Sequence, residues 1–117
     1  MHIPTDESIQ LALTVDGGFT FDPHSGRFLR VGETKGYAIA IPGTEVNALA
    51  EMLVNHTITD NAFIGGWNDE TGKLWLELSE ILDITCEQAI LIGRARNQLA
   101  IMNFLTGEVI DTSPATV

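Results

Sequence analysis

The hairpin pattern between residues 62 and 82 constrains the fold more than any other feature of the sequence. The segment AFIGGW is followed by the turn segment NDETGK and then by LWLELSEIL. From 74 to 78 every other residue is leucine, and polar or aromatic residues stand between. This period of two predicts a strand with one apolar face. The glycines at 65 and 66 are unusual inside a strand, where they mark a bulge or the close approach of another backbone.

The remaining chain reads as strands and helices separated by turn residues. We expect further strands at 9–15, 19–21, around 28, 36–41, 99–104 and 109–110, with helices at 45–55 and from about 84 to 96. A helix over 6–14 capped by Asp6 is an alternative for the first segment; Thr44 and either Asp83 or Thr85 are the expected caps of the other two. The predicted fold is α+β, a single antiparallel or mixed sheet of about five to six strands with two helices on one face.

The length and termini predict one domain with loose ends. The chain has 117 residues, which is enough to bury a core without disulfides or a structural metal. We expect a flexible N-terminus over 1–8, a single domain over 9–111 and a flexible tail over 112–117.

The cysteine content and the N-terminal segment predict a cytoplasmic protein. The single cysteine, Cys86, cannot form an internal disulfide, which favours a reducing compartment. The first fifteen residues lack the basic and apolar regions of a secretory signal. No apolar run approaches the length of a membrane span.

The net charge is extreme and indicates the kind of partner. Sixteen acidic and six basic residues give a formal charge of −10. Direct binding to nucleic acid or to an anionic membrane is disfavoured, because both require cationic side chains. A basic protein partner or a divalent cation is favoured instead. The simpler interpretation is that the charge only keeps a small protein soluble.

No motif in the sequence predicts a catalytic, metal or cofactor site. The three histidines lack a second ligand at metal-binding spacing, and Asp69-Glu70 lacks the calcium-loop pattern. Glu77 and Glu80 are expected on opposite faces of a strand, so they do not form an acid–base pair. A non-enzymatic role is therefore favoured. The alternative is a small metal-dependent or Cys/His-based enzyme that folding would assemble from Asp22, His24, His56, Asp69 and Cys86.

What remains is an acidic, tryptophan-bearing surface on the predicted hairpin. Aromatic anchors beside carboxylates suit contact with a basic protein. We expect this interaction surface to comprise Trp67, Asp69, Glu70, Trp75, Glu77, Glu80 and Asp83. The other interpretations are a solvated strand face and a structural homo-oligomer formed through an edge strand.

Several segments resemble a family of mobile-element proteins. The resemblance rests on the segments GGWNDETGKLWLELSEIL and AILIGRARNQLAIMNFLTGEVI and on the N-terminal FTFDPHSG and GYAIAIPG. Together they resemble short acidic uncharacterised proteins of actinobacterial phages, prophages and plasmids. The chain departs from that family at Met102-Asn103, where an aromatic residue and aspartate are expected. The resemblance implies a mobile-element accessory protein, such as an inhibitor of a host protein, and it brings no catalytic residues.

Overall fold

The computed structural model describes residues 1–113. Part of the flexible tail expected over 112–117 therefore lies outside the described residues. Thr112 is buried, and its hydroxyl donates a hydrogen bond of 2.6 Å to the backbone carbonyl of Gln98. At this end of the described chain, Thr112 is thus held by the fold.

The chain divides into two compact units. Unit 1 comprises Met1–Arg30 and Gly43–Leu78, and unit 2 comprises Val31–Pro42 and the chain from Ser79 onward. In hydrogen-bonding order the strands run β2-β1-β4-β5-β3-β6-β7, and β5 begins in unit 1 and ends in unit 2. The expectation of a single domain over 9–111 stays a prediction.

Unit 1 begins with the helix α1 (Asp6–Asp16), where the pattern favoured a strand over 9–15. That expectation is wrong and the alternative helix is correct, but Asp6 is its first residue and not its cap. Ile9 and Leu13 lie one helical turn apart and are 2% and 6% exposed, whereas Leu11 and Val15 are 66% and 69% exposed. The cap is Thr5, whose side chain accepts from the backbone N–H of residue 8. The spacing of four between Ile9 and Leu13 fits a helix as well as a strand, and the helix cap at Thr5 favours the helix.

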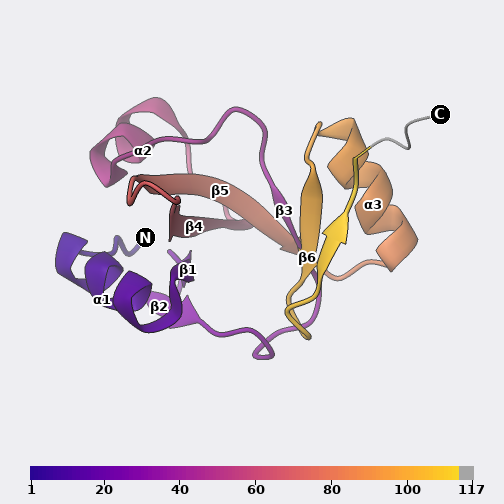
Figure 1. The fold of residues 1–117 in the computed structure, drawn as a ribbon, viewed down its shortest axis with the longest axis horizontal. Helices are drawn as coiled ribbons and strands as arrows, with labels where there is room; N and C mark the ends of the chain where they lie inside the picture. The colour runs from indigo at the N-terminus through magenta and orange to yellow at the C-terminus, as the bar shows by residue number, and fades with distance from the viewer. Residues whose placement is uncertain (114–117) are drawn as a thin grey trace. The chain divides into compact units, whose positions relative to one another are not determined.

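The strands of unit 1 are β1 (Gly18–Asp22), β2 (Arg27–Leu29), β4 (Ala62–Asn68) and the first part of β5 (Leu74–Leu82). α1 packs on β1 and β4, and Figure 1 shows it directly beside β1. The buried face of these strands carries Phe21, Ala62, Ile64, Leu76 and Leu78. The alternating leucines of β5 thus face the core, as the sequence predicts.

The two glycines of β4 have different surroundings, and only one of them lacks the space for a side chain. A Cβ at Gly66 would lie 2.3 and 2.5 Å from ring atoms of Phe19, so the ring occupies the place of a side chain. Phe19 and Gly66 are paired across β1 and β4. The close approach at Gly66 is thus made by a side-chain ring and not, as the sequence indicates, by another backbone. Gly65 has no such neighbour, since its Cβ would meet nothing nearer than 3.8 Å.

The helix α2 (Leu49–Asn55) begins four residues later than the predicted start at 45. Residues 44–47, which we name the edge segment, run beside β5 instead, and Val46 forms an antiparallel bridge with Leu76. Thr44 is therefore not a helix cap: its hydroxyl accepts the backbone N–H of Leu78 at 3.0 Å. The burial of Val46 and the hydrogen bond to Leu78 stabilise this extended segment.

Unit 2 contains β3 (Tyr37–Ala40), the end of β5, α3 (Cys86–Ala95), β6 (Ala100–Asn103) and β7 (Val109–Asp111). Its core is formed by Ile39, Ala89 and Ile101, with α3 packed on β3 and β6. Thr85 caps α3 through a capping box with Gln88, so Thr85 rather than Asp83 is the cap.

The predicted α+β class is confirmed, with an antiparallel sheet of seven strands and three helices. The predicted numbers are too low. The strands expected around 28 and at 109–110 are the short edge strands β2 and β7, whose hairpins close through left-handed glycines, Gly26 (φ 73°) and Gly107 (φ 79°). The extra helix is α1. Within residues 1–113 no helix has both the length and the apolar character to cross a membrane.

Candidate functional site

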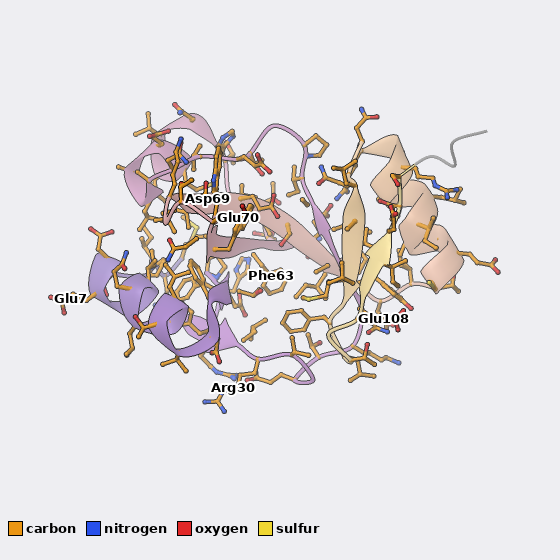
Figure 2. The ribbon with its side chains drawn as sticks, in the orientation of Figure 1. Glu7, Arg30, Phe63, Asp69, Glu70 and Glu108 are labelled. Atoms are coloured by element: carbon orange, nitrogen blue, oxygen red, sulfur yellow. The ribbon has the colours of Figure 1, made fainter. Side chains whose placement is uncertain are left out.

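The turn between β4 and β5 is organised by one carboxylate. Oδ1 of Asp69 accepts the backbone N–H of Thr71 (2.8 Å), the hydroxyl of Thr71 (2.6 Å) and the backbone N–H of Lys73 (3.0 Å). These hydrogen bonds, led by that of the Thr71 side chain and joined by one from Trp75, lower the pKa of Asp69 below its usual value. Figure 2 shows Asp69 and Glu70 together at this turn. Asp69 is thus a structural residue of the hairpin.

The same carboxylate orients Trp75. The indole N–H of Trp75 donates to Oδ2 of Asp69 at 3.0 Å. The ammonium of Lys73 lies 4.9 Å from the centroid of the Trp75 ring, a cation–π contact. The half-buried ring is held from its edge and from its face. A partner that contacts Trp75 would not need to order it first, which lowers the entropic cost of binding.

Glu77 lies next to Trp75 on what we name the polar face, the side of unit 1's strands opposite Leu76 and Leu78. Val46 and Leu76 exchange backbone hydrogen bonds of 2.9 and 2.8 Å, and this pairing sets Glu45 opposite Glu77. Burial, and then the charge of Glu45, raise the pKa of Glu77 to about 7. Among residues 1–113, no hydrogen bond or salt bridge reaches this carboxyl.

Glu80 and Asp83 belong to unit 2 and have partners there. Glu80 forms an ion pair with Arg96, and both side chains are mostly buried. Nη1 of Arg96 is buried with no hydrogen-bond partner in the described part of the chain. Asp83 pairs with Lys35 at 3.8 Å, but both side chains are about 70% exposed, so that contact contributes little.

The seven residues of the predicted interaction surface belong to both units. Trp67, Asp69, Glu70, Trp75 and Glu77 lie in unit 1, and Glu80 and Asp83 lie in unit 2. Asp69 and Trp75 contact each other directly. The sequence interpretation missed Glu45, because it assigned residues 45–55 to a helix. The alternation of Thr44 and Val46 with Glu45 is the strand pattern in the sequence that could have found it.

The residues of the alternative hypothesis, a small enzyme, lie on several different elements. Asp22 accepts the backbone N–H of His24 at 2.9 Å within the β1–β2 turn. His56 follows α2, whereas Cys86 begins α3 in unit 2. There the Cys86 thiol forms a hydrogen bond with the Tyr37 hydroxyl that raises the pKa of Tyr37. In the described range 1–113, no cluster of three or more His, Cys, Asp or Glu side chains could hold a metal ion.

Comparison with known protein families, with curated proteins and with solved structures finds no match to this chain. Candidate functions therefore rest on the geometry of the residues themselves.

Proposed function

We propose that this chain is a small non-enzymatic binding protein that contacts a basic protein through the acidic, tryptophan-bearing β4–β5 hairpin. The observation that carries this proposal is the fixed orientation of Trp75, held by Asp69 and Lys73. Ordered aromatic side chains are typical anchors of protein interfaces.

The charge around Trp75 supports a basic partner. Glu70 is exposed at the turn, and Glu45 and Glu77 lie on the polar face. These carboxyls would attract a basic protein and favour its correct orientation. The resemblance to proteins of actinobacterial phages and plasmids favours a host protein as the partner. The sharpest version is an inhibitor of a host defence or restriction protein.

The test is capture of the partner by immobilised protein from a lysate of the source organism, followed by direct binding to the purified partner. The hairpin variant combines Trp75→Ala with Glu70→Lys. The matched control is Glu7→Lys, which makes the same charge change on the exposed face of α1, away from the hairpin turn (Figure 2). Circular dichroism of every variant establishes that it is folded.

We expect the wild type and Glu7→Lys to bind the same protein, and the hairpin variant to lose it. Binding should also weaken as salt is added, since exposed charges are screened over about 8–10 Å at physiological ionic strength. A folded hairpin variant that binds the partner as well as the wild type would exclude this surface.

A further inference from the structure

The polar face carries a glycine, Gly65, and therefore lacks a side chain at one point. Residues 62, 64 and 66 of β4 are buried, so Gly65 lies on the opposite side of the strand. A Cβ at Gly65 would meet only two atoms within 4 Å, the backbone oxygens of Glu77 and Phe19, both at 3.8 Å. Gly65 is itself partly exposed, and these ordinary contact distances leave room for a group from outside beside it.

Aromatic and acidic residues lie near Gly65 on the same face. Trp67 follows Gly65 on the same face of β4, two residues along the strand. Glu77 lies beside Gly65 on β5, and Glu45 lies beyond Glu77 on the edge segment. Thr20 is paired with Gly65 on β1. On this face the pairing thus sets a glycine beside one tryptophan and near two glutamates.

These groups match the chemistry of a guanidinium. It is flat, less strongly hydrated than an ammonium, and able to stack on an indole while it donates two parallel hydrogen bonds to a carboxylate. The neighbouring Trp75 already accepts the ammonium of Lys73 over its ring, so indole–cation contact occurs on this face within the chain itself. Glu77 has no donor of its own among residues 1–113, whereas Asp69 and Glu80 have theirs.

We propose that the polar face binds an arginine side chain of a protein partner, which lies over Gly65 between Trp67 and Glu77, with Glu45 as the second carboxyl. This inference rests on the proposed function and adds the chemical nature of the contact. An arginine here supplies the hydrogen bonds that the Glu77 carboxyl lacks and offsets the repulsion between the two glutamates.

Proton binding gives an independent readout. The pKa of Glu77 is raised to about 7 by burial and by Glu45, so the carboxyl of the free protein is about half protonated at neutral pH. Glu45 is the charged group that faces it from the edge segment. β4 offers Gly65 and Trp67, which carry no charge, and on β5 the nearest base, Lys73, covers Trp75. An arriving guanidinium lowers the pKa of Glu77, and a proton leaves.

The experiment uses the full chain and a short blocked peptide that contains arginine. Its control is the same peptide with citrulline, which has the same shape without the charge. Binding is followed by NMR at the Gly65 amide, the Trp67 indole N–H and the Glu77 side-chain carboxyl. Three variants accompany the wild type: Glu77→Gln removes the acceptor, Gly65→Leu places a side chain at the glycine, and Glu7→Gln removes an exposed charge on α1.

We expect saturable shifts at these three groups with the arginine peptide and none with the citrulline peptide. Affinity should rise about tenfold between pH 6 and 8, following the ionisation of Glu77. Glu77→Gln and Gly65→Leu should abolish the shifts, and Glu7→Gln should retain them. Absence of shifts, equal shifts with citrulline, or pH-independent binding would each overturn the inference.

The inference and the proposed function fail in different ways. If the natural partner is lost from the Trp75→Ala/Glu70→Lys variant but still binds Glu77→Gln and Gly65→Leu with unchanged affinity, the hairpin is the interface and the arginine contact is wrong. If the folded hairpin variant also retains the partner, the proposed function itself is wrong.

Discussion

Replacing Glu77 with glutamine should stabilise the protein at alkaline pH and leave it almost unchanged at acidic pH. The pKa of Glu77 is about 7 in the folded protein against its usual 4.5. At about 1.4 kcal/mol for each tenfold change in proton affinity, the difference corresponds to about 3 kcal/mol. Because the side chain is partly exposed, solvent screening reduces this to roughly 1–3 kcal/mol. Glutamine keeps the shape of the side chain and removes the ionisation.

The sign follows from the raised pKa. Between about pH 4.5 and about pH 7, the folded state holds a proton on Glu77 that the unfolded state has lost. The free energy of unfolding of the wild type therefore decreases as the pH rises through this window, and this contribution levels off above it. Glu77→Gln lacks the dependence, so its advantage over the wild type should increase from near zero at about pH 4 to the full value at about pH 8.

The assay is urea denaturation followed by tryptophan fluorescence at a series of pH values. Glu70→Gln is the matched control, because Glu70 is exposed at the turn and its removal should change the stability little at any pH. Glu45→Gln should give part of the effect, since it removes the charge that faces Glu77 but not the burial. A stability difference between Glu77→Gln and the wild type that is the same at acidic and alkaline pH would refute the reasoning.

Two further predictions concern packing and hydrogen bonding in unit 1. Gly66→Ala should cost about 1–3 kcal/mol by forcing its Cβ against the ring of Phe19, whereas Gly65→Ala, with open space, should cost less than about 1 kcal/mol; equal losses in urea denaturation would contradict this. Thr44→Val should cost about 1–3 kcal/mol by leaving the buried N–H of Leu78 unpaired, and Thr44→Ser should retain most of the stability. Thermal melts measure the stability of both variants. A valine variant as stable as the serine variant would show that the hydrogen bond to Leu78 does not stabilise the protein.

Local features of the chain were predictable where one physical signal dominated. The β4–β5 hairpin follows from the leucine alternation and the Asp69 turn, and the start of α3 follows from the Thr85 capping signal. The first helix was ambiguous because Ile9 and Leu13 fit both periodicities. Strand order lay beyond local pattern, since β1 pairs with β4, and β3 pairs with both β5 and β6.

The candidate site shows why the density of charge in the sequence was a poor guide to its location. Asp69, Glu80 and Asp83 all lie in the predicted acidic surface, yet each carboxylate already has a partner. Asp69 accepts hydrogen bonds within the turn, Glu80 pairs with Arg96, and Asp83 pairs with Lys35. Glu77 differs because the bridge between Val46 and Leu76 places Glu45 opposite it.

That bridge joins residues thirty apart in sequence, with positions 46 and 76 on separate elements. A local pattern can place a carboxyl on the polar side of a strand, but it cannot say which charge faces it across the sheet. The free energy of a carboxyl depends on that neighbour and on burial, as the raised pKa of Glu77 illustrates. A functional carboxyl in such an acidic chain is therefore better sought where the fold leaves one half-buried without a donor than where the acids are most numerous.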